Sequence, residues 1–198
     1  MQTLRRDINS IAASFEEAEL NILRSLLCQL IELLSDARPQ PRNCGRAAAD
    51  DIFSRLEREL GLDEQFNSPA DYYLQTDPVL TRLFPKAYVD DEYASDEFAR
   101  YTQPALMADK LDCAQLVLDD LQPDAQGCCV IPTEHYQAWF KSLTNLRLAL
   151  AVRLDIEDAD DTDRLAELPD DNPNAWVYSI YEWLGWVQEC LLAACDED

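Results

Sequence analysis

The most chemically versatile side chains in this sequence are its seven cysteines. Cys128 and Cys129 are adjacent, and Cys190 and Cys195 lie near the end of the chain. Zinc sites usually place paired cysteines about two to four intervening residues apart, and the vicinal pair fits this poorly. A thiol that senses an oxidant needs thiolate character and access to solvent. We treat these four as candidate redox thiols, against the alternative that they fill small apolar spaces.

The spacing of Cys190 and Cys195 bears on whether they can form a disulfide. In an intact helix, Cα atoms five positions apart are separated by roughly 8–9 Å. A disulfide normally requires less than about 7 Å. We therefore predict no 190–195 disulfide, unless the last turn of the helix frays.

His135 is the only histidine of the chain. Metal sites and catalytic triads often use histidine, so one copy removes most histidine-based mechanisms. It falls in the first turn of an expected helix, where a solvent-facing or capping role is favoured over catalysis.

The run of aspartates at 155–163 invites comparison with a calcium-binding loop. An EF-hand loop needs glycine at its sixth position and a bidentate glutamate at its twelfth. Counted from Asp158, these positions hold Asp163 and Pro169. The match fails, so we expect a charged, solvated loop and no metal site.

Two apolar segments, 145–154 and 181–190, each contain a few charged residues. Arg147 and Arg153 lie in the first segment, and each needs a carboxylate or backbone partner if it is buried. Glu182 and Glu189 are seven apart on one face of the second helix, which makes them reasonable partners. We predict a structural ion-pair network from these four residues, in preference to a catalytic one.

No established catalytic motif accompanies these residues. The sequence has no glycine-rich phosphate loop, no nucleophile elbow and no helical histidine pair. We therefore expect a protein that is not an enzyme and needs no cofactor. The alternative is an enzyme with a carboxylate-rich, metal-assisted pocket, because sequence spacing does not reveal carboxylates that converge in a cleft.

The charge balance restricts the partners of the chain. Lys and Arg number 16 against 39 Asp and Glu, a formal net charge of −23. Phosphate backbones select clustered basic residues, so this surface should repel nucleic acid and anionic lipid. No apolar leader or membrane-spanning stretch is found in the sequence, which predicts a cytoplasmic protein whose cysteines are mostly reduced.

Helical periodicity dominates the elements that position these residues. We expect a single, mainly all-α domain over residues 1–198, with flexible segments at 37–46 and 156–172. Ser14-Phe-Glu-Glu17 is read as a capping box that starts a helix to about Asp36. Asp77-Pro78 starts a short helix, Pro104 interrupts a later one, and Asn172-Pro173 starts the last.

One short β element is also expected. Residues 128–131 are β-prone and apolar, and residues 10–14 share the same layout of a short extended piece followed by a helix. We predict that these two segments pair as a small two-stranded ribbon.

Several segments together resemble one known family. They are Leu23-Arg-Ser-Leu26, residues 77–88, residues 145–154 and Tyr181-Glu-Trp-Leu-Gly-Trp-Val-Gln-Glu189. In this combination and order, the chain is similar to the actinobacterial oxidative-stress regulator (AosR-like) family, long catalogued as a domain of unknown function. The resemblance implies a helical cytosolic protein with a role in redox-responsive transcription through a partner such as a sigma factor. It also implies a gene neighbourhood that includes a Clp-protease adaptor.

The leading hypothesis is therefore a non-enzymatic regulatory protein that acts through protein–protein contacts in oxidative-stress-responsive transcription. A chain so acidic should contact a basic surface of the transcription machinery, with no direct binding to nucleic acid or membrane. Besides the enzyme described above, an accessory role in Clp-dependent proteolysis is an alternative. The oligomeric state stays open, with a homodimer among the options.

Overall fold

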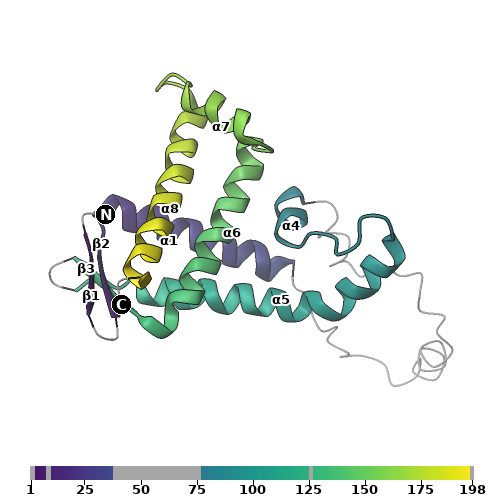
Figure 1. Ribbon diagram of the computed structural model, residues 1–198, viewed down its shortest axis with the longest axis horizontal. Helices are drawn as coiled ribbons and strands as arrows, with labels where there is room; N and C mark the ends of the chain where they lie inside the picture. The colour runs from purple at the N-terminus through teal and green to yellow at the C-terminus, as the bar shows by residue number, and fades with distance from the viewer. Residues whose placement is uncertain (1–2, 8–9, 38–76, 125–126, 197–198) are drawn as a thin grey trace, which may run out of the picture.

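Leucines at helical spacing build the first helix. The computed structural model describes residues 3–7, 10–37, 77–124 and 127–196 (Figure 1). Helix α1, Glu17–Asp36, buries five leucines along one face, namely Leu20, Leu23, Leu27, Leu30 and Leu34. This is the stripe that the sequence predicts, and it ends at the expected residue.

The start of α1 differs from the prediction. Ser14 closes a strand, and the N-cap is Glu16, whose side chain accepts a hydrogen bond from the N3 backbone. Glu19 completes the capping box, with its Oε2 accepting from the Glu16 backbone N–H at 2.8 Å. A hydrogen-bonded strand fixes Ser14 in extended pairing, so the cap moves two residues along the chain.

The predicted ribbon is present, with one further strand. Strand β2, Ser10–Ser14, pairs antiparallel with β3, Cys128–Pro132, as expected. Strand β1, Thr3–Asp7, adds to the other side of β2 and gives the order β1-β2-β3. The sequence analysis did not predict β1.

The sheet has one buried face. Ile11 lies opposite Ile131 and Ala13 lies opposite Cys129, and all four side chains are fully buried. Val130, between Cys129 and Ile131 in β3, is 53% exposed. Because successive side chains of a strand point to opposite faces of the sheet, alternate residues of β3 lie in the core.

Helix α4, Pro78–Leu83, begins as predicted. The Asp77 carboxylate accepts from the backbone N–H groups of Val79 at 2.8 Å and Leu80 at 3.2 Å, and Pro78 occupies the first turn.

Helix α5, Glu92–Asp120, contradicts the predicted interruption at Pro104. It runs through the proline, and Figure 1 shows it bending toward its N-terminal end. Proline inside a helix removes one backbone hydrogen bond and favours a bend without necessarily ending the helix. Its core residues Met107, Cys113, Ala114 and Val117 all follow Pro104, so packing against the core continues the helix across it.

Helix α6 is the centre of the molecule. After a 3₁₀ turn, Thr133–His135, it runs from Tyr136–Leu154 and contacts α1, α4, α5 and α8. Asp155 ends it in a left-handed conformation, φ 57°. Figure 1 shows α6 and the last helix, α8 (Pro173–Asp196), joined at one end by α7.

Helix α7, Ala159–Ala166, lies within the segment 156–172 that the sequence analysis expected to be flexible. Asp158 is its N-cap and Asp161 completes a capping box. Two of the acids that were expected to lie in a solvated loop therefore cap the first turn of a helix. The start of α8 is as predicted, because Asn172 Oδ1 accepts from the Asn174 N–H at 2.9 Å. Residues 38–46 of the other segment expected to be flexible lie outside the described residues.

Across the described ranges, no helix combines the length and apolar character needed to cross a bilayer.

The sheet makes a prediction about stability. Ile131→Ala removes a fully buried side chain and should lower the free energy of unfolding by about 2–5 kcal/mol. Val130→Ala, one position away on the exposed face, should cost less than about 1 kcal/mol. Urea unfolding followed by circular dichroism compares the two. Equal effects would contradict the assigned face of β3.

Candidate functional site

The two apolar segments singled out in the sequence lie side by side. Residues 145–154 form the second half of α6, and residues 181–190 lie in the middle of α8. The two helices contact each other, so their polar residues are positioned by one interface.

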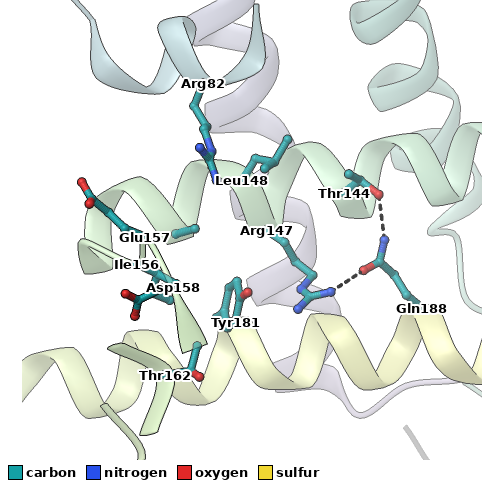
Figure 2. A pocket seen from close by; sticks show the side chains of 11 residues that line it. Arg82, Thr144, Arg147, Leu148, Ile156, Glu157, Asp158, Thr162, Tyr181 and Gln188 are labelled. Carbon is teal, nitrogen blue, oxygen red and sulfur yellow. Dashed lines mark hydrogen bonds between the residues drawn. The ribbon is translucent and has the colours of Figure 1, made fainter. Parts of the chain in front are cut away.

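Arg147 is the central polar residue of this interface. Its Nη1 donates to Oε1 of Gln188 at 3.0 Å, and its Cζ lies 4.6 Å from the ring centroid of Tyr181. Gln188 in turn donates from Nε2 to Oγ1 of Thr144 at 2.9 Å. Figure 2 shows this chain of hydrogen bonds crossing from α6 to α8 and back. The guanidinium is thus held by a neutral amide and an aromatic face.

Gly185 makes room for this arrangement. A Cβ at this position would lie 3.3 Å from Cζ of Arg147 and 3.4 Å from its Nη2. Tyr181, Gly185 and Gln188 are spaced by four and three residues, which places them on one helix face. That spacing of an aromatic, a small and an amide residue is the signal that sequence reasoning missed.

The predicted ion-pair network does not form. Across the described residues, no ion pair joins Arg147 or Arg153 to Glu182 or Glu189, and all of these except Arg147 are exposed. The face of α8 that meets α6 carries Gln188, while both glutamates point to solvent. A carboxylate loses hydration when it is buried, so a neutral amide is the less costly partner at this interface.

A surface depression of about 330 Å³ lies at this interface. Its walls come from α4, α6, α7, α8 and the residues after α6, and Figure 2 labels most of them. Arg82 reaches in from α4, and Leu148, Ala151 and Ile156 provide an apolar wall. The size falls at the lower end of the range for small-molecule sites.

His135 belongs to a second polar cluster, at the N-terminal end of α6. Its Nδ1 lies 3.0 Å from both carboxylate oxygens of Asp120, the last residue of α5. Oδ2 of Asp120 also accepts from Nε1 of Trp139, which is fully buried, at 2.9 Å. His135 occupies the N-cap position of α6, but its side chain makes no capping hydrogen bond and is paired with Asp120, so the expected solvent-facing or capping role of the side chain is not seen. The cluster joins the end of α5 to the start of α6, a structural function.

The four candidate redox thiols occupy different environments. Cys129 is fully buried in the sheet, and desolvation raises its pKa to about 11. Burial also raises the pKa of Cys190, which is a free thiol, so no 190–195 disulfide is present. Cys128 and Cys195 are partly exposed. Because the thiolate is the reactive form, Cys129 is the least suited of the four to sense an oxidant.

The calcium interpretation, already rejected from spacing, gains no support. Asp158 Oδ1 accepts from the backbone N–H of Asp161 at 3.2 Å, and Asp161 Oδ2 accepts from that of Glu157 at 2.9 Å. Within the part of the chain that the structure describes, no group of three or more His, Cys, Asp or Glu side chains is arranged to hold a metal ion.

The Asp120 cluster predicts a stability effect. Asp120→Ala leaves the buried Trp139 N–H without an acceptor, and should lower the free energy of unfolding by about 2–3 kcal/mol. Asp112→Ala, exposed on the same helix, is the matched control and should change it by less than about 0.5 kcal/mol. Urea unfolding measures both, and similar values for the two variants would contradict the structural function of the cluster.

The thiol environments predict an order of alkylation. At pH 8, well below a pKa of about 11, Cys129 stays protonated and buried, so iodoacetamide should modify it slowest. Cys28 is exposed on α1 and should react at least about tenfold faster. Peptide mass spectrometry over a time course gives each rate, with urea-unfolded protein as the reference. Equal rates for the two thiols in the folded protein would refute this order.

Three relatives illustrate what the chain is similar to. It is 30% identical over 129 residues to the oxidative stress regulator AosR of Mycobacterium tuberculosis (strain ATCC 25618 / H37Rv) and to that of Mycobacterium bovis. Each match covers 59% of this chain and 57% of the relative. The putative oxidative stress regulator AosR of Mycobacterium leprae is 30% identical over 131 residues, covering 60% of this chain and 58% of the relative. The match therefore spans little more than half the length of these relatives.

No solved structure matches the chain. The relatives confirm the resemblance to the AosR-like family inferred from the sequence. The family model described as Domain of unknown function (DUF2017) matches residues 1–195, nearly the whole sequence. The chain therefore belongs to the DUF2017 family.

Proposed function

We propose that this chain is a non-enzymatic regulatory protein that acts in the response to oxidative stress by binding another protein. The names of its mycobacterial relatives support the stress-related role. The structural observation that supports binding to a protein is the surface of the first half of α5.

This half of α5, with the residues just before it, exposes large apolar side chains. They are Tyr88, Val89, Tyr93, Phe98, Tyr101 and Leu106, with exposed fractions from 47% to 92%, and we call them the α5 arm. Phe98 packs edge-on against Tyr88, with ring centroids 6.1 Å apart. Figure 1 shows this part of α5 extending beyond α6 and α8. Exposed tyrosine and phenylalanine clustered in this way are typical of protein-binding surfaces.

The charges around the α5 arm indicate what kind of partner it fits. Residues 86–106 contain five acids, namely Asp90, Asp91, Glu92, Asp96 and Glu97, against two bases, Lys86 and Arg100. One of those bases is already paired, with Nζ of Lys86 2.9 Å from Oε1 of Glu92. An aromatic surface bordered by acids complements a segment rich in Lys and Arg. The same charge disfavours a second copy of this chain as the occupant.

A basic protein surface is common among proteins that bind nucleic acid. A chain with net charge −23 would regulate transcription by binding such a surface on a component of the transcription machinery, for example a sigma factor. Its charge disfavours direct binding to DNA. This cytoplasmic regulatory role by protein contact is the function that the α5 arm and the family together support best.

The α5 arm gives the first test of this proposal. A partner captured from the native host is purified, and its affinity for wild-type protein is compared with that for the double variant Tyr93→Ser, Tyr101→Ser. Truncating one hot-spot aromatic costs about 2 kcal/mol or more, which is about thirtyfold in affinity, so the double variant should bind at least about thirtyfold more weakly. Trp176→Ser, which changes a 62% exposed aromatic on α8, is the control and should bind normally.

Three results would contradict the proposal. The double variant could bind the partner as tightly as the wild type, or the α5 arm could mediate only self-association in sedimentation experiments. Tight, salt-sensitive binding of the purified chain to promoter DNA would overturn the choice of a protein partner.

A further inference from the structure

The depression between α6 and α8 has chemistry that the proposed protein contact does not use. Its lining comes from α4, α6, α7, α8 and the residues between α6 and α7, and includes none of the residues of the α5 arm. The part of α5 that carries the arm extends beyond α6 and α8 (Figure 1). Two arginines, Arg82 and Arg147, line it in a chain that carries more than twice as many acids as bases.

Neither arginine is neutralised. Across the described residues, no ion pair joins Arg82 or Arg147 to a carboxylate. Two acids, Glu157 and Asp158, also line the depression, but Figure 2 shows their carboxylates pointing away from Arg147. Asp158 is occupied as the cap of α7. The positive charge inside the depression is therefore available to an anion.

The hydrogen bonds of Arg147 show which of its groups remain unused. Nη1 donates to Gln188, while Nε is buried and has no partner among the described residues. The edge formed by Nε and Nη2 is the side of a guanidinium that binds a carboxylate with two parallel hydrogen bonds. A buried donor without an acceptor costs about 1–3 kcal/mol, which an incoming carboxylate would recover. Cζ, Nη2 and Nε of Arg147 all lie next to Gly185 of α8, and Nε is buried, so a carboxylate reaches this edge only after the guanidinium rotates away from α8.

The rest of the lining specifies more than charge. Tyr181 presents its ring beside the guanidinium, and Leu148, Ala151 and Ile156 form an apolar wall. Thr144 and Thr162 add hydroxyl groups at the rim. An inorganic anion would leave the apolar wall in contact with water, whereas an organic acid would cover it.

We propose that the α6–α8 depression binds a small organic carboxylate with an apolar body, its carboxylate on Arg147 and its body against Tyr181 and the apolar wall. Arg82, on α4, adds a second positive charge at the entrance. The neutral Gln188 holds Nη1 of Arg147 without cancelling the charge of the guanidinium.

Isothermal titration calorimetry of the full chain at low salt tests the site with benzoate, the smallest planar carboxylate with an apolar body. Benzoate should bind saturably to the wild type. Its affinity should fall at least tenfold in Arg147→Gln and by a few-fold in Arg82→Gln. Arg153→Gln, which removes the same charge from an exposed position of α6, should leave affinity unchanged. Thermal unfolding of each variant confirms that it folds.

Three companion probes separate the contributions. Acetate and inorganic phosphate carry charge without an apolar body, and benzamide carries the body without charge, so all three should bind at least tenfold more weakly than benzoate. A match between benzoate and either acetate or phosphate would overturn the role of the apolar wall. A match with benzamide would overturn the role of Arg147, as would equal losses in Arg147→Gln and Arg153→Gln. Absence of saturable benzoate binding would overturn the site itself.

Gly185→Ala provides a test that leaves every charge in place. The added methyl group would lie 3.3 Å from Cζ of Arg147, so the guanidinium must shift. Benzoate affinity should then change at least threefold while acetate binding stays weak. Unchanged benzoate affinity in a correctly folded Gly185→Ala protein would show that Arg147 does not contact the carboxylate, and would overturn the proposal.

Discussion

Burial of α6 on several sides at once is the constraint on which the rest of the structure depends. The helix contacts four others, so water cannot solvate most of its length. Each polar side chain it carries must find a partner on a neighbouring helix or remain unsatisfied. Trp139 bonds to the end of α5, and Arg147 bonds to α8. Asn145, also buried, accepts from Nζ of Lys110 on α5 at 2.8 Å.

These cross-helix contacts fix more than stability. A purely apolar α6 could slide or rotate against its neighbours with little change in energy, whereas a hydrogen bond at a fixed position selects one arrangement. The Asp120 contact sets the corner between α5 and α6, and the Gln188 contact sets the register of α6 against α8. The depression is a result of the second contact, because Gln188 and Gly185 hold Arg147 between the two helices.

The sequence predicted the elements whose signal is local. The leucines of α1, the Asp77 cap and the Asn172 cap each depend on residues within a few positions, and each is confirmed. The β2–β3 pairing was also predicted, because both segments share an extended, apolar character. The wrong predictions concern features that depend on residues distant in the sequence. Strand pairing places the N-cap of α1 at Glu16 and not at Ser14, and core packing continues α5 past Pro104.

The candidate site shows the same division between local and distant signals. The sequence analysis identified Arg147 as a polar residue of an apolar segment but predicted glutamates as its partners. Only the packing of α8 shows that its inward face carries Gln188 and that Glu182 and Glu189 face water.

The course of α5 through Pro104 divides one continuous helix into two parts of unequal local stability. Proline has no N–H, so the carbonyl four residues earlier loses its helical partner at this point. The part after Pro104 supplies core residues such as Ala114 and Val117, whereas Ser95 is the only buried residue before it. Backbone amides of the first part should therefore exchange with solvent through small local openings, while those of the second part exchange only when the whole domain unfolds. A partner that binds the first part would therefore stabilise a helical segment that the core of the domain holds at few points.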